Sequence, residues 1–176
     1  MPRWSRSPGV PRDVVATLPL APGERVLAAS PDLQGHWQVG TERSLHLTVD
    51  GGWLSLPWQR VERATWDRDT ERLVVIEVAD FGQPQPRHVV ALDEPGRLLE
   101  LIHERVTASV VLARHVPVSG SRGLKVVGRR APGGYGAIEW SCWLDEGLEP
   151  ADPEVAAAVE AGLASARAEL GEPPSR

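Results

Sequence analysis

Short runs of alternating apolar and polar residues recur between residues 23 and 92, and glycine, proline and acidic residues separate them. A period of two places successive side chains on opposite faces of a β-strand, and frequent glycine and proline favour short strands over long helices. The pattern predicts seven strands at the spacing of an antiparallel meander: 25–30, 36–41, 44–49, 53–58, 61–67, 72–79 and 87–92.

The segment 44–49 shows the cleanest alternation, so we expect one of its faces in the core and the other in water. Its apolar positions are Leu45, Leu47 and Val49, and its polar positions are Ser44, His46 and Thr48. Asp50 and Gly51 come next, and an Asp-Gly pair adopts positive φ at low cost, which predicts a tight hairpin. The run 73–76 is instead continuously apolar, which is typical of a strand covered on both faces.

A helical period replaces the alternation after residue 92. Asp93 is a candidate N-cap, and Pro95 suits the first helical turn. Leu99, Ile102 and Val106 then recur on one side, with Leu98 beside them, which predicts an amphipathic helix that covers the preceding strands and fades at 107–109. The β-branched pair at 110–111 favours a strand over 110–118, although a longer helix is the alternative for residues 107–118.

The last third of the chain predicts a smaller sheet and a terminal helix. Further strands are expected at 124–130 and 137–145, joined by a glycine-rich loop. Asp152 as N-cap, Pro153 at the first helical position and an apolar stripe that ends at Leu170 predict a helix that stops near Gly171. We expect the segment 110–171 to pack with 23–109 as one body. The five prolines of residues 1–22 predict an irregular N-terminal arm, and residues 172–176 are expected to be a disordered tail.

Seven antiparallel strands closed by one amphipathic helix are similar to a pleckstrin-homology-like barrel. Residues 23–27, the turn at Thr41 and residues 57–61 resemble the bacterial version of that domain. The resemblance implies an α+β, mostly β fold: a seven-stranded antiparallel barrel with a capping helix, followed by a three-stranded antiparallel sheet and a C-terminal helix. Domains of this family variously bind phosphoinositides, peptides or other proteins, so the resemblance implies a binding module.

A second resemblance covers most of the chain. Residues 58–67, 105–109 and 145–148 resemble a family of uncharacterised proteins common in actinobacteria. This likeness implies no function.

The chain has 176 residues, one cysteine and a formal net charge of −5. This length suits one globular domain, or one domain with an appendage. No apolar run is long enough for a transmembrane segment and the N-terminus lacks the apolar region of a signal peptide, so we expect a cytoplasmic protein. The lone Cys142 excludes an internal disulfide, and the negative charge argues against bulk attraction to nucleic acid.

No familiar catalytic or cofactor motif occurs in the sequence, so we expect neither an enzyme nor a bound cofactor or metal. The five histidines, at 36, 46, 88, 103 and 115, lack metal-ligand spacing, and His46 is the least implausible ligand among them. Cys142 alternates with Trp140 and Leu144 on an apolar face, where burial would raise the thiol pKa and leave it unreactive. Ser121 lacks the glycine spacing and the following helix of a nucleophile elbow.

One basic cluster opposes the overall charge of the chain. Its members lie within 17 positions that contain no Asp or Glu: Arg114, His115, Arg122, Lys125, Arg129 and Arg130. The five arginines and lysines are candidate contacts for an anion or a nucleic acid, with Tyr135 in the next loop as a stacking partner. A solvated face of a hairpin is the simpler interpretation.

The sequence holds seven tryptophans, and most lie in or beside predicted strands, where core packing is the usual role. Trp143 lies on the opposite face of its strand from Trp140, so one of the two should be exposed or covered by another element. Trp143 and Tyr135 are therefore candidate interface residues. We rank first a non-enzymatic binding or scaffolding protein with a protein or small-ligand partner. A nucleic-acid or anion-binding protein ranks second, and an enzyme with an unrecognised site ranks third.

Overall fold

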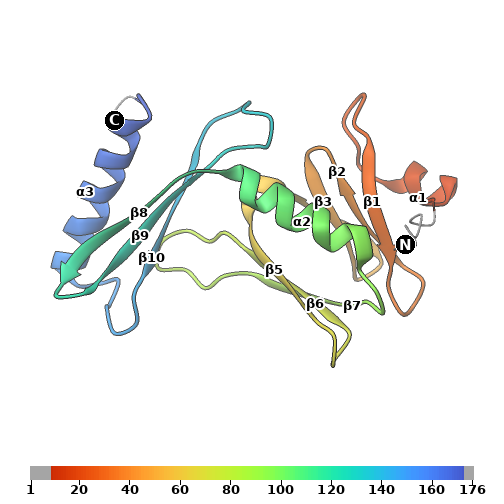
Figure 1. Cartoon of the computed structure of the whole chain (residues 1–176), viewed down its shortest axis with the longest axis horizontal. Coiled ribbons are helices and arrows are strands. Elements are labelled where there is room, and N and C mark those ends of the chain that lie inside the picture. Colours follow the sequence, from red (N-terminus) through yellow and green to blue (C-terminus); the bar gives the residue numbers. More distant parts are fainter. Residues whose placement is uncertain (1–8, 173–176) are drawn as a thin grey trace, which may run out of the picture.

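The computed structural model of the chain describes residues 9–172. The first eight residues of the predicted arm, and residues 173–176 of the predicted tail, lie outside the described part. Within it the fold is α+β and mostly β, with three antiparallel sheets and three α-helices (Figure 1). None of the helices described has the length and apolar character that crossing a bilayer requires.

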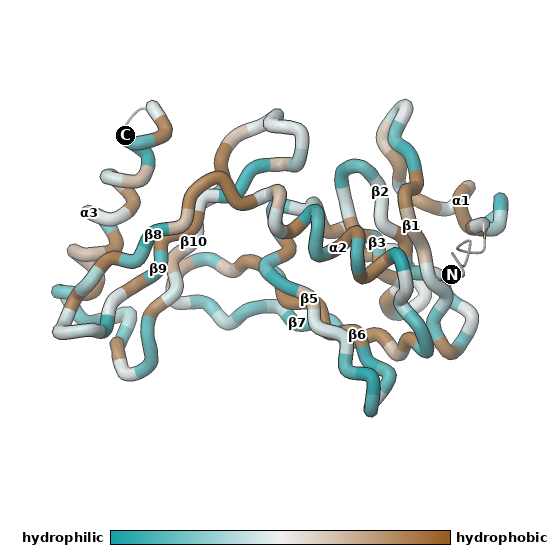
Figure 2. Tube along the Cα trace, viewed as in Figure 1, coloured by the Kyte–Doolittle hydropathy of each residue, from teal (hydrophilic) through white to brown (hydrophobic). Residues whose placement is uncertain are grey.

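The first two sheets come from the seven strands expected between residues 23 and 92. The first sheet has the order β1-β2-β3-β4, and the second has the order β5-β6-β7. Their strands are β1 Val26–Pro31, β2 Trp37–Thr41, β3 Ser44–Val49, β4 Gly52–Pro57, β5 Val61–Asp67, β6 Arg72–Glu77 and β7 Arg87–Ala91. The turn between β5 and β6 is hydrophilic throughout and projects from the body (Figure 2).

The strand pairing does not close into the expected seven-stranded barrel. The described strands form a four-stranded and a separate three-stranded ladder, and a 3₁₀ turn, η1 Trp58–Arg60, stands between β4 and β5. Pro57 at the end of β4 has no N–H to donate to a ladder. The turn at residues 58–60 then redirects the chain, so β5 begins the second sheet instead of extending the first.

The third sheet and the three α-helices complete the fold. The sheet has the order β10-β9-β8, from β8 Val110–Ser119, β9 Arg122–Arg129 and β10 Glu139–Leu144. The helices are α1 Arg12–Thr17, α2 Gly96–Ser109 and α3 Pro153–Glu169. The segment 110–118 is therefore a strand and not an extension of the helix before it, since β8 follows α2 with no intervening residue.

The main core lies between the first two sheets and α2. Trp58 is fully buried at its centre, and its indole Nε1 donates to the carbonyl of Thr41 at 3.0 Å. Around it lie the fully buried Leu45, Leu47, Val61, Leu73, Val75, Leu92, Leu98 and Ile102. Gly40 lets α2 approach β2 closely, because a Cβ on it would lie 2.5 Å from Cδ2 of Leu101.

The predicted cap of α2 is wrong. The N-cap is Pro95, not Asp93, and no side chain caps the helix. The buried face also differs from the predicted stripe, because Leu101 is buried beside Leu98 and Ile102, whereas Leu99 and Val106 are only partly buried. The helix therefore covers the core with the Leu98–Ile102 turn.

The polar face of β3 is covered, which contradicts the expectation that it lies in water. His46 is 1% exposed, and the segment 9–22 packs over this side of the sheet. The segment is not wholly irregular, because it contains α1, and Leu18 packs with Ala29 and Val39 in a small second core. The imidazole of His46 accepts or donates a hydrogen bond at Ser55 Oγ, 2.8 Å away.

The third core lies between α3 and the sheet β10-β9-β8. It contains Leu124, Val126, Cys142, Val155, Val159 and Ala166. The predicted start of α3 is confirmed, because the Asp152 carboxylate accepts the N–H of Glu154 at 2.8 Å and Pro153 is the first helical residue. Gly162 lets α3 approach the sheet, since a Cβ on it would lie 3.1 Å from Val116.

Arg129 of β9 joins the third sheet to the rest of the molecule. Its side chain is buried, and the guanidinium donates to Ser109 Oγ at 2.9 Å, the Glu62 carbonyl at 3.2 Å and the Val106 carbonyl at 3.3 Å. The acceptors lie at the end of α2 and in β5, so one cation bridges three elements. We name Arg129 with these three acceptors the junction.

We predict that Arg129→Met lowers the free energy of unfolding by about 2–3 kcal/mol, because methionine removes all three hydrogen bonds of the junction and leaves the Glu62 carbonyl without this donor. Urea unfolding measures this loss. Lys125→Met, on the exposed side of the same strand, is the control and should change the free energy by less than about 0.5 kcal/mol. Equal stability of Arg129→Met and the wild type would contradict the assigned role.

Burial lowers the pKa of His46 below 6.5, and the charge of Glu24 offsets this only in part. As pH falls below 6.5 the unfolded chain takes up a proton first, so the folded state loses stability between pH 6.5 and the lower folded pKa. We predict that His46→Phe, which cannot titrate, flattens the stability profile in this window. Denaturant unfolding at a series of pH values measures the free energy of unfolding. Above pH 7, where His46 is neutral in both states, its pH dependence should be the same in the variant and the wild type and serves as the control. An unchanged slope below pH 6.5 would contradict the prediction.

Candidate binding groove

An open pocket of about 410 Å³ lies between the loop that joins β6 to β7 and the chain that leaves β10. The loop reaches from the second sheet toward the third, so the two walls come from opposite sides of the junction (Figure 1). The lining residues are Asp80, Phe81, Gly82, Gln83, Pro84, Cys142, Trp143, Leu144, Asp145, Glu146, Gly147, Leu148 and Pro150. We name this pocket the groove.

The apolar part of the groove centres on Trp143. Its side chain is half-buried, as are those of Phe81 and Leu148. Phe81 and Leu148 also pack against the core between α3 and the third sheet, which holds both walls in place. The structure therefore places the predicted interface residue Trp143 in the groove. Phe81 was not predicted, because a lone aromatic in a loop has no periodicity that would assign it to a site.

Three carboxylates give the groove an acidic rim, and its lining residues include no lysine or arginine. Asp80 and Glu146 are exposed. Asp145 lies 3.0 Å from Nε2 of His115 and accepts the backbone N–H of Gly123 at 2.7 Å. These two hydrogen bonds, that of His115 first, hold the pKa of Asp145 below its usual value of 3.8, so it is ionised at neutral pH.

Cys142 offers no nucleophile to the groove. Its side chain lies in the core, and burial raises the pKa of the thiol to about 11, although Arg167 opposes the shift. The thiol therefore stays protonated at neutral pH and acts as a small apolar residue. Among the described residues no three His, Cys, Asp or Glu side chains are placed to hold a metal ion. The groove offers aromatic and aliphatic surface beside negative charge.

The five arginines and lysines of the predicted basic cluster do not converge on one surface. Arg114 turns toward α3, where it hydrogen-bonds Ser165 and forms an ion pair with Glu169. The prediction of Arg129 as a contact is wrong, because its guanidinium is buried in the junction, and Arg130 is half-buried. A sequence cannot show which basic side chain of a strand will find buried acceptors.

Of the five arginines and lysines, two remain exposed, Lys125 and Arg122. Lys125 pairs in register with Trp143, so it lies on the face of the sheet opposite to α3. The guanidinium of Arg122 lies beside the backbone at Gly147, where a Cβ would come within 2.8 Å of it. Arg122 is thus a neighbour of the groove and not part of a basic surface.

Tyr135 lies outside the groove. It is 48% exposed in the loop between β9 and β10, and the guanidinium carbon of Arg43 lies 5.8 Å from its ring centre. This cation–π contact brings the loop to the turn between β2 and β3. The structure therefore separates the two aromatic residues that the sequence suggested as interface candidates.

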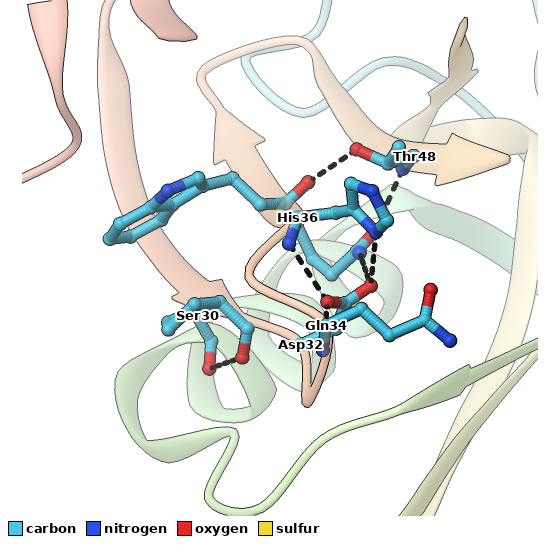
Figure 3. A network of polar contacts seen from close by, with 8 residues as sticks. Ser30, Asp32, Gln34, His36 and Thr48 are labelled. Atoms are coloured by element: carbon cyan, nitrogen blue, oxygen red, sulfur yellow. Dashed lines mark hydrogen bonds and ion pairs between the residues drawn. The ribbon is translucent and has the colours of Figure 1, made fainter. Parts of the chain in front are cut away.

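A polar network lies at the turn between β1 and β2 (Figure 3). The Asp32 carboxylate accepts the backbone N–H groups of Gln34 and His36, each at 2.8 Å. Gln38 is fully buried, and its Oε1 accepts the N–H of Thr48 at 2.9 Å. These groups satisfy one another and hold the turn on the sheet, so the network is structural.

No family model, no curated protein and no solved structure matches this chain. The likeness to pleckstrin-homology domains and to uncharacterised actinobacterial proteins therefore stays a prediction.

Proposed function

We propose that this chain is a non-enzymatic binding or scaffolding protein that holds a protein partner in the groove. The observation that carries the proposal is the half-buried Trp143, which stands in an open pocket beside Phe81 and Leu148. A large aromatic side chain that is partly desolvated before binding gains most when a partner covers the rest of it. The acidic rim would give such a partner its orientation.

The rigidity of the groove supports this proposal. Trp143 is held by the strand β10, whereas Phe81 and Leu148 pack on the third core. A wall that is ordered before binding loses little conformational entropy when a partner arrives. The protonated thiol of Cys142 gives this surface no nucleophile at neutral pH, which favours a binding role over catalysis.

We also propose a pleckstrin-homology-like arrangement for residues 23–109, in the cytoplasm. Two antiparallel sheets of four and three strands that share one core with the following helix α2 support this arrangement. On this proposal the third sheet and α3 are an addition that supplies one wall of the groove.

We predict that Trp143→Ala reduces capture of the partner from a lysate of the source cells by at least about tenfold, because a central aromatic anchor contributes about 2 kcal/mol or more. Quantitative mass spectrometry of proteins captured by the tagged full chain measures this. Tyr135→Ala, an exposed aromatic outside the groove, is the matched control and should capture as the wild type does.

Glu146→Lys is a second groove variant, for the case that Trp143→Ala fails to fold. Glu146 is exposed, so its charge reversal leaves the core untouched. This variant should lose the same captured proteins. If both groove variants capture the same proteins as the wild type in equal amounts, the proposal is wrong.

A further inference from the structure

The strand β10 forms one edge of the third sheet, and it borders the groove. The N–H of Asp145 donates to the carbonyl of Gly123, directly opposite, at 2.9 Å. Hydrogen-bonded and non-bonded pairs alternate along an antiparallel ladder. Trp143 therefore bonds to β9, whereas the N–H and C=O groups of Cys142 and Leu144 point away from it. Within the described residues, these outward groups have no hydrogen-bond partner.

The opposite edge of the same sheet, formed by β8, lacks a backbone donor at one outward position. By the same alternation, Leu124 and Val126 bond to β8, so the outward positions of β8 include His115 and Pro117. Pro117 has no N–H to offer and is typical of a protected edge. The outward positions of β10 carry no proline and no charged side chain. Of the two edges, only β10 has a full set of donors and acceptors for another strand.

We infer that the groove receives an extended, basic peptide segment of a partner protein, which adds as a strand to the free edge of β10. The inference rests on the proposed function, because it names the form of partner that the same groove would hold. Strand addition satisfies the outward backbone groups of β10, and alternate side chains of the incoming segment point to opposite faces.

Charge and shape determine the chemistry of the segment. One set of its side chains would lie on the same face of the sheet as Trp143, which suits an aliphatic or aromatic residue. Lysine or arginine on neighbouring positions would face the rim carboxylates Asp80 and Glu146, while Asp145 is already engaged by His115. The segment is therefore basic and apolar in alternation, with no proline at the positions that bond to β10.

The test uses the full chain and a random octapeptide library displayed on phage. We predict that selection enriches peptides in which Lys or Arg alternates with apolar residues. Fluorescence anisotropy of one enriched peptide should show at least about tenfold weaker binding to Asp80→Lys and Glu146→Lys, because one repulsive contact replaces an attractive one. Asp69→Lys, in the exposed turn between β5 and β6, is the matched control and should bind as the wild type does.

Backbone N-methylation of the enriched peptide separates strand addition from docking of side chains alone. Methyl groups on the alternate nitrogens that bond to β10 should weaken binding at least about tenfold, since several hydrogen bonds are lost together. Methyl groups on the other set of nitrogens should change it little. An equal effect of the two sets, or a selection that enriches no basic peptide, would overturn the inference.

Two further outcomes are informative. Sedimentation that detects a dimer of this chain, abolished by Glu146→Lys, would assign the β10 edge to a second copy and overturn the inference. Lysate capture that depends on Trp143 while no octapeptide is enriched would reject strand addition and leave the proposed function standing. Equal capture by Trp143→Ala and by the wild type would instead reject the proposed function itself.

Discussion

The buried guanidinium of Arg129 is the interaction on which the rest of the arrangement depends. Desolvation of a cation is costly unless acceptors surround it, and burial indeed lowers the pKa of this group, with the charge of Glu62 opposing the shift. The acceptors come from Val106, Ser109 and Glu62, so β9 can bury this side chain only when α2 and β5 are already in place. The carbonyls at the end of α2 also carry the negative end of the helix dipole, which favours a cation there. Packing of the third sheet is thereby coupled to the fold of the first two.

The geometry of the groove depends on the junction, because the two walls of the groove come from opposite sides of the junction. The loop after β6 is held near the third sheet by Arg60, which donates to the Val78 carbonyl at 3.1 Å and lies 3.4 Å from the Glu139 carboxylate. Glu139 pairs in register with Arg129, so these contacts lie next to the junction. No residue separates α2 from β8, so the third sheet lacks the freedom to move relative to α2 that a flexible linker would give it. A rigid connection is what lets two loops from different sheets form one surface.

Periodicity predicted every strand and both long helices to within two residues at each end, because burial on one face determines the pattern of side chains. It failed where a second layer covers a face that the pattern assigns to water, as at His46 beneath the N-terminal segment. It also failed at Arg129, since charge alone does not reveal buried acceptors that lie 20 and 67 residues away. The closed barrel was not found because a proline and a tight turn interrupt the ladder. Trp143 was predicted from its strand face, whereas Phe81 depends on tertiary packing of a loop.

A ligand that contacts both walls of the groove would act on the junction as well. Binding to the assembled form alone favours that form by mass action, so a partner held between Phe81 and Trp143 would stabilise the docking of the third sheet on the first two. The reverse holds by linkage: weakening the Arg129 contacts would lower the population in which both walls are in place, and with it the apparent affinity. Burial of the Arg129 guanidinium and binding at the half-buried Trp143 are thus linked through the same docking equilibrium, although Arg129 does not line the groove.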